Sequence, residues 1–122
     1  MVYANHEMSH RICDMTFGAL AQFMPESVMA CSQGTSAIVN FGGQDPRDGN
    51  RYVSDETIKG GSGARCGKDG INTVAAGISN TMNTPIEVLE MSFPLRVDYY
   101  EILADSGGLG KWRGGCGARR AW

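Results

Sequence analysis

Glycine is the residue that most restricts what this chain can fold into. Seventeen of its 122 residues are glycine, where average usage would give about nine. They gather in three stretches, at 42–49, 60–70 and 107–117. Glycine weakens helix and strand interiors but permits backbone conformations that other residues avoid. The sequence therefore predicts three glycine-rich turns or loops, with regular elements between them.

A helix is predicted ahead of the first glycine stretch, over residues 5–24. Apolar residues recur there at steps of three and four, which is the spacing of one helix face: Met8, Ile12, Met15, Ala19 and Phe23. Pro25 ends the pattern. The helix therefore carries one apolar stripe.

The rest of the chain has the composition of strands. Apolar and β-branched residues at 37–41 and 52–58 flank GGQDPRDGN, which is dense in turn residues, so residues 36–58 are a predicted hairpin. Residues 86–103 show near-alternation broken by Pro94, and we interpret them as one long bent strand or two short ones. A further strand begins within 116–122. The predicted fold class is α+β, with one amino-terminal helix followed by a mostly antiparallel β-rich region with long glycine-rich loops.

Composition and charge exclude several classes of partner. The net charge of −2 gives no electrostatic reason to expect nucleic acid or an anionic membrane surface. No apolar run approaches the roughly 20 residues of a membrane helix, and the polar first residues lack the apolar core of a signal peptide. The cysteines at 13, 31, 66 and 116 form no CxxC pair, so we interpret them as reduced thiols. We expect a cytoplasmic protein.

The HExxH pattern of His6, Glu7 and His10 is that of a zinc hydrolase, in which two histidines one turn apart bind zinc and the glutamate acts as the base. The context argues against it. The sequence has no other histidine, so Asp14 or Glu26 would have to be the third ligand. Both histidines also lie opposite the apolar stripe. We interpret the match as fortuitous and assign no metal site.

Two glycine loops resemble phosphate-binding motifs only in part. The spacing from Gly61 is GxGxxxG, one residue longer than the dinucleotide fingerprint, and it precedes no clear helix. Gly110-Lys111 is followed by Trp112 in place of the serine or threonine of a P-loop. Neither loop is a nucleotide site. Glu87 and Glu90 would point to opposite sides of the predicted strand, which excludes a carboxylate pair.

Taken together, the loops resemble one family. The stretches ETIKGGSGARCGKDG, SNTMNTPIEVLEMSFPLRVDYYE and DSGGLGKWRGGCGARR follow in order as in the hydantoinase B/oxoprolinase family, and GALAQFMPESVMA and CSQGTSAIVNFGG also match it. The resemblance covers essentially the whole chain. It implies that residues 1–122 are a single partial domain, the carboxy-terminal segment of a larger B-type subunit. Ser62 and Cys66 depart from the family, which usually has a large aromatic residue and a proline there.

The resemblance also implies a reaction. Together with an A-type subunit that binds ATP, members of the family open cyclic amides such as N-methylhydantoin or 5-oxoproline, and relatives carboxylate acetone or acetophenone. The chain would then be part of an ATP-dependent amidohydrolase and inactive alone. The alternatives are a segment of such a carboxylase and a non-catalytic interaction domain. The expected partners are the A-type subunit, the remainder of the B-type subunit and a small-molecule substrate.

No cofactor is expected within this segment, whereas ATP and a divalent metal are expected for the full complex, because the family's Asp/His metal-type motifs lie upstream. No catalytic residue is assigned. The positions that match the family motifs are candidates for ligand or subunit contacts: Arg65, Lys68, Asp69, Asn80, Asn83, Glu87, Asp105 and Arg113. For Asn83 and Asp105 the sequence favours a simpler role in forming turns.

Overall fold

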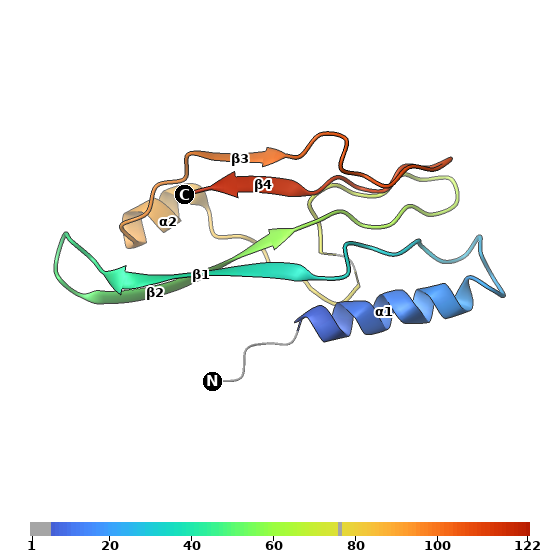
Figure 1. Ribbon diagram of the computed structural model, residues 1–122, viewed down its shortest axis with the longest axis horizontal. Helices are drawn as coiled ribbons and strands as arrows, with labels where there is room; N and C mark the ends of the chain where they lie inside the picture. The colour runs from blue at the N-terminus through green and yellow to red at the C-terminus, as the bar shows by residue number, and fades with distance from the viewer. Residues whose placement is uncertain (1–5, 76) are drawn as a thin grey trace.

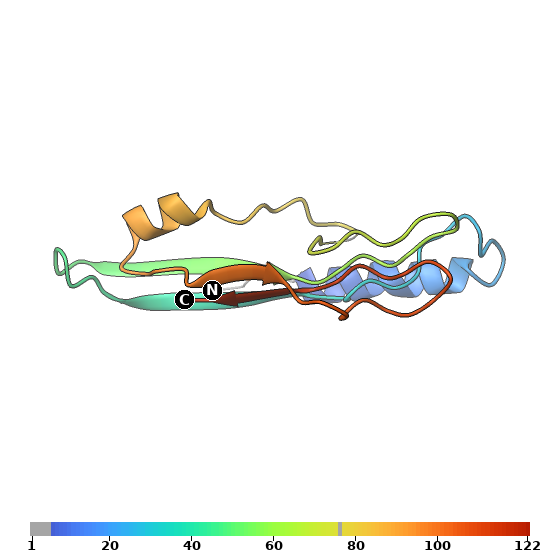
Figure 2. The same ribbon diagram turned by 90° about the horizontal axis from the view of Figure 1, so that it is seen from above.

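Two antiparallel hairpins and two helices make up the part of the chain that the structure, a computed structural model, describes: residues 6–75 and 77–122 (Figure 1). In chain order the elements are α1 (His6–Leu20), β1 (Ser36–Gln44), β2 (Arg51–Lys59), α2 (Ile86–Ser92), β3 (Tyr99–Ile102) and β4 (Ala118–Ala121). The predicted α+β class is confirmed. Figures 1 and 2 show glycine-rich loops gathered beside α1 at one end, with the β1–β2 turn and α2 at the other.

The predicted hairpin is confirmed as β1 paired with β2. The register runs from Ser36 opposite Lys59 to Gln44 opposite Arg51. The pairing reaches further into the glycine stretch than the composition suggested, because Gly42 and Gly43 lie in β1 opposite Val53 and Tyr52. The connecting turn is therefore only residues 45–50.

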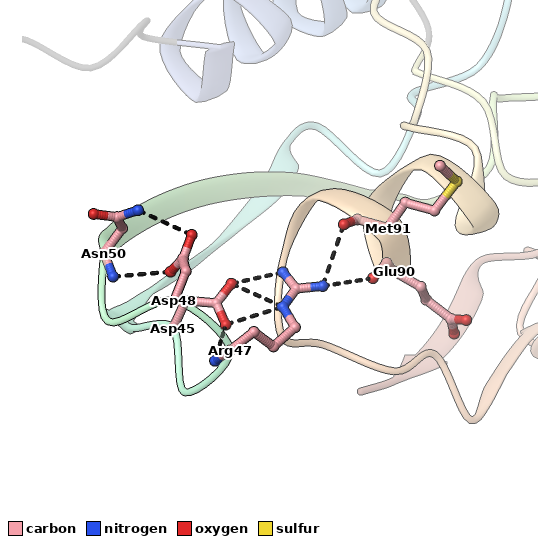
Figure 3. Close-up of polar contacts among 6 residues, drawn as sticks. All are labelled: Asp45, Arg47, Asp48, Asn50, Glu90 and Met91. Atoms are coloured by element: carbon pink, nitrogen blue, oxygen red, sulfur yellow. Dashed lines mark hydrogen bonds and ion pairs between the residues drawn. The ribbon is translucent and has the colours of Figure 1, made fainter.

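Asp45 and Arg47 organise this turn (Figure 3). Arg47 donates from Nε and Nη2 to the Asp45 carboxylate, the Nη2–Oδ2 distance being 2.6 Å. Its Nη1 reaches the carbonyl oxygen of Met91 at 3.2 Å, close to that of Glu90. These are carbonyls at the end of α2, where a helix leaves acceptors unsatisfied. One guanidinium thus fixes the turn and ties α2 to it.

The Asp45–Arg47 contact predicts an acid-sensitive hairpin. Hydrogen bonding from Arg47 lowers the pKa of the Asp45 carboxyl below its ordinary value. A carboxyl with a lowered folded-state pKa contributes stability above its unfolded pKa, about 3.9, and loses it as the pH falls through the folded value. We expect the stability difference between the wild type and Asp45→Asn to shrink as the pH drops below about 4. Denaturant unfolding from pH 7 to 2 measures this, with exposed Asp55→Asn as the control. A constant difference would contradict it.

The prediction of strand over residues 86–92 is wrong, because they form α2. The apolar residues there satisfy both periods: Ile86 and Val88 alternate, but Ile86, Leu89 and Phe93 also follow helical spacing. Leu89 is fully buried, and its N–H donates to the Pro85 carbonyl at 3.0 Å. Burial on one face, and the Arg47 contact at the end, favour the helix. The predicted strand survives only as β3.

The strand argument about Glu87 and Glu90 is therefore also wrong, since on α2 they lie three residues apart on adjoining positions. They do not form a working pair of carboxylates. Glu87 is exposed, whereas Glu90 accepts a hydrogen bond from the Val97 N–H at 2.8 Å. Glu90 thus anchors the chain between α2 and β3.

The second hairpin, β3 with β4, packs on the first through a buried ion pair. The predicted strand at the end of the chain is confirmed as β4. From β4, Arg120 Nη1 donates to Glu56 Oε2 of β2 at 2.8 Å, and both side chains are 1% exposed. Asn83 Nδ2 donates to the same oxygen at 3.0 Å and to the Thr57 carbonyl at 2.6 Å. Polar contacts thus join the two hairpins. The buried apolar residues among those described are Leu89 and Cys116.

Helix α1 packs through its polar side. Asp14 accepts hydrogen bonds from the Ser32 N–H and hydroxyl at 3.1 and 3.0 Å, and His10 is buried. The apolar stripe faces outward, with Ile12 and Met15 51% and 65% exposed. The stripe predicted from the sequence exists, but the described part of the chain does not cover it.

Candidate functional site

Two glycine-rich loops, residues 60–70 and 107–117, pack backbone against backbone at the end of the molecule near α1 (Figure 1). The Ser62 N–H donates to the Ile71 carbonyl at 3.0 Å, and the Gly115 N–H donates to the Ser62 carbonyl at 2.9 Å. The Gly70 N–H bonds the Arg113 carbonyl at 2.7 Å. Residues 60–64, 70–71 and 113–115 are thus joined edge to edge.

This close approach explains particular glycines. A Cβ on Gly61 would overlap the backbone of Gly115, and a Cβ on Gly63 would overlap the carbonyl of Ala30. A Cβ on Gly115 would overlap the Ile71 carbonyl. These positions require glycine because neighbouring backbone occupies the space of a side chain.

The packed loops border a cleft of about 520 Å³, which is within the range of small-molecule sites. It is lined by residues from 30–33, 58–64, 103–109 and 112–118. Apolar side chains come from Ile58, Leu103, Leu109 and Trp112, and much of the remaining lining is glycine. A small ring with polar edges is the kind of molecule that such a mixed surface can enclose.

Lys59 is the charged residue of this lining, at the end of β2 where the chain enters the second glycine stretch. It is 8% exposed. Directly opposite it in the hairpin, Ser36 is 6% exposed. Lys59 is not among the candidates predicted from the sequence, because a lysine at a strand end usually lies on the surface. The sequence feature that could have indicated Lys59 is its position between Ile58 and two consecutive glycines.

None of the eight candidate residues from the motifs, all of which the structure describes, lines the cleft. Arg65 and Lys68 are exposed and close a tight turn, each N–H bonding the other's carbonyl at 3.0 Å. Asp69 accepts a hydrogen bond from the Arg113 N–H at 2.7 Å, and Arg113 Nη1 contacts Cys116 Sγ at 2.7 Å. The structure thus brings Asp69 and Arg113 together across two loops.

The other four candidates lie elsewhere. Asn83 holds Glu56 and Thr57, as described above. Asn80 and Glu87 are exposed. Asp105 is exposed and adopts a positive φ of 58°, and the next residue, Ser106, lines the cleft. Asp105 therefore shapes the turn that leads to the cleft wall.

The structure describes only part of the HExxH pattern on α1. His10 is buried on the inward side of the helix, whereas the side chain of His6 lies outside the described residues. Within 6–75 and 77–122, no three His, Cys, Asp or Glu side chains come close enough to hold an ion together. In the same ranges, no helix has the length and apolar character to cross a membrane.

Comparison with known proteins places all 122 residues within one family. Residues 1–122 match the family described as hydantoinase B/oxoprolinase. The chain is 38% identical over 117 residues to the B-type subunit of a D-/L-hydantoinase from Pseudomonas sp. (strain NS671), covering 96% of the chain and 19% of that protein. It is 39% identical over 108 residues to the beta subunit of a caprolactamase from Pseudomonas jessenii, covering 83% and 18%.

A 5-oxoprolinase of Pestalotiopsis fici is 36% identical over 96 residues, which cover 75% of the chain and 8% of that protein. The chain thus spans about a fifth of the length of the two bacterial relatives and less of the fungal protein. No solved structure shows a significant match.

Proposed function

Because this chain belongs to the hydantoinase B/oxoprolinase family, we propose that it forms part of the B-type subunit of an ATP-dependent enzyme that hydrolyses a cyclic amide. The observation that carries the proposal is the family match over residues 1–122. The names of three relatives support it, since hydantoin, caprolactam and 5-oxoproline are all cyclic amides.

The cleft supports the same proposal from the structure. Its volume suits a five- to seven-membered ring. Leu109 and Trp112 offer apolar contact to the ring carbons, while backbone groups of the glycine loops and the hydroxyls of Ser62 and Ser106 offer hydrogen bonds to its amide. In this proposal the segment binds and orients the substrate.

We further propose that the activating chemistry comes from other parts of the complex. Two relatives are named as subunits, which supports assembly with a partner. An A-type subunit would bind ATP, and the remainder of the B-type subunit would supply the divalent metal site. The exposed apolar stripe of α1, which includes Ile12 and Met15, offers a surface for contact with that remainder.

The direct test is reconstitution. The full-length subunit and its A-type partner are purified together and incubated with hydantoin, 5-oxoproline or caprolactam, with and without ATP, and the ring-opened product is measured. We expect ATP-dependent ring opening of one of the three. Carboxylation of acetone or acetophenone instead would assign the complex to the related carboxylases. If neither activity is detected, the result favours a non-catalytic interaction domain.

A cleft variant tests whether this segment contacts the substrate. We expect Trp112→Ala to raise KM by about tenfold or more, because it removes an apolar wall from the ring's environment. Tyr99→Ala, which truncates an exposed aromatic residue of β3, is the matched control. Equal KM values in the two variants would remove the cleft from the proposal.

A further inference from the structure

Lys59 is a largely buried lysine that has no ion-pair partner among the described residues. The residue is 8% exposed and is part of the cleft lining. Within residues 6–75 and 77–122, its ammonium makes no ion pair or side-chain hydrogen bond. The cleft lining contains no aspartate or glutamate. A buried charge is costly unless it is paired, so the position favours an anion as the partner.

Ser36 lies beside Lys59 in the hairpin but is not part of the cleft lining. It is paired directly with Lys59 across the β1–β2 ladder, and residues directly opposite in an antiparallel pair present their side chains on the same face. The Ser36 hydroxyl is buried and lacks a hydrogen-bond partner among the described residues. Buried polar groups are normally hydrogen-bonded. The Ser36 hydroxyl is enclosed and does not line the cleft, so Lys59 is the group of this pair that can meet a ligand there.

We propose that Lys59 binds the carboxylate of a small organic acid in the cleft. The single positive charge matches one negative charge, whereas a phosphate dianion would bring a second charge with no cation in the lining to meet it. The half-buried Leu103 and Trp112 of the lining suit the carbon skeleton of such an acid. Lys59 then acts as a binding residue that orients the ligand.

The choice of acid rests on the proposed function. In hydrolysis of a cyclic amide, water adds across the C–N bond: its oxygen goes to the carbonyl carbon and a proton to the nitrogen. The products therefore carry one new carboxylate. 5-Oxoproline also has a carboxylate before the ring opens, whereas hydantoin has none. The anion that Lys59 holds is thus either a carboxylate of the substrate or the one formed in the reaction.

Calorimetric titration of the full-length subunit with its A-type partner, without ATP, tests the proposal. The probes are 5-oxoproline, its ring-opened product glutamate, neutral hydantoin and inorganic phosphate. We expect Lys59→Met to weaken carboxylate binding by about tenfold or more, the effect of losing one charged hydrogen bond. Lys59→Arg should retain most of it. Lys68→Met, at an exposed lysine of the neighbouring loop, should bind as the wild type does.

The probes separate the two sources of the carboxylate. Sensitivity of both 5-oxoproline and glutamate binding to Lys59→Met assigns the carboxylate that the substrate already carries, whereas sensitivity of glutamate binding alone assigns the new one. Equal carboxylate affinity in the wild type and Lys59→Met would overturn the proposal. Phosphate binding that depends on Lys59 and exceeds that of both acids would overturn the choice of ligand.

Thermal unfolding keeps the test decisive if a variant binds nothing. Without ligand, Lys59→Met should melt at or above the wild-type temperature, because the variant no longer buries an unpaired charge. Two results together would show that Lys59 is structural and would overturn the proposal. In the first, neither 5-oxoproline nor glutamate stabilises the wild type; in the second, Lys59→Met is less stable than the wild type. If the wild-type complex opens the ring but Lys59→Met binds carboxylates as the wild type does, this inference alone is contradicted. Lys59-dependent binding without ring opening would contradict only the proposed reaction.

Discussion

Replacing Arg120 by methionine is expected to lower the free energy of unfolding by about 3–5 kcal/mol, which is the cost of leaving one member of a buried ion pair alone. Glu56 would keep its charge in a position that is 1% exposed, with Asn83 as its remaining hydrogen-bond donor. The substitution also removes the guanidinium from the faces of Tyr100 and Trp122, 5.0 Å from each ring centroid. Because this pair joins β2 to β4, we expect the hairpins to separate early in unfolding.

Denaturant unfolding measures this effect, and two variants control it. Arg119→Met removes the neighbouring arginine, whose contact with Glu101 is 3.6 Å long and half-exposed, so its effect should stay below about 1 kcal/mol. The double variant Glu56→Leu with Arg120→Met removes both charges and should recover most of the loss. Some atoms of the pair, Glu56 Oε1 and Arg120 Nε among them, have no partner in the described residues, which favours this recovery. A double variant as unstable as the single one would contradict the electrostatic account.

Replacing Gly61 by alanine is expected to destabilise the protein by about 3 kcal/mol or more, at the upper end of overpacking costs. The added Cβ would overlap the Gly115 backbone. A backbone obstacle cannot rotate away as a side chain can, so the two loops must separate. We expect the Gly115–Ser62 hydrogen bond to be lost and the cleft to change shape.

Gly108→Ala is the matched control for this prediction. Gly108 borders the same cleft, but a Cβ there would meet no atom within 4 Å. Alanine should therefore leave stability unchanged or raise it by about 0.4–1 kcal/mol through the unfolded chain. Denaturant unfolding measures both variants, and the near-ultraviolet dichroism of Trp112 reports on the cleft. Equal stability of the two variants would show that the loops are not packed backbone to backbone.

The local sequence pattern was sufficient to predict α1 and the first hairpin. The spacing from Met8 to Ala19 predicts α1, and the turn residues after Phe41 predict the first hairpin. The segment at 86–92 was not decidable in this way, because its apolar residues fit both a strand and a helix. The outcome depends on Arg47, about forty residues away along the chain, and on the burial of Leu89.

The candidate site was harder to predict, because it is built from distant segments. The motifs include the glycine-rich stretches that border the cleft, but they do not indicate which side chains face inward. Arg65 and Lys68 were candidates because they are charged residues within a motif, but they lie exposed at a turn. Lys59 lies in an ordinary strand pattern, yet it lines the cleft. The Glu56–Arg120 pair joins residues 64 positions apart, and no periodicity indicates such a contact.

The backbone packing of the loops also limits how this cleft can evolve. At Gly61, Gly63 and Gly115 most mutations would damage the fold before they altered the ligand, because neighbouring backbone fills the space next to each residue. Selection for a new substrate must therefore act mainly on the few walls made of side chains, such as Gln33, Leu109 and Trp112. Under the proposed function, a descendant of this protein could accept a larger or more polar ring after a few substitutions in these side chains, while the glycine backbone beside them stays the same.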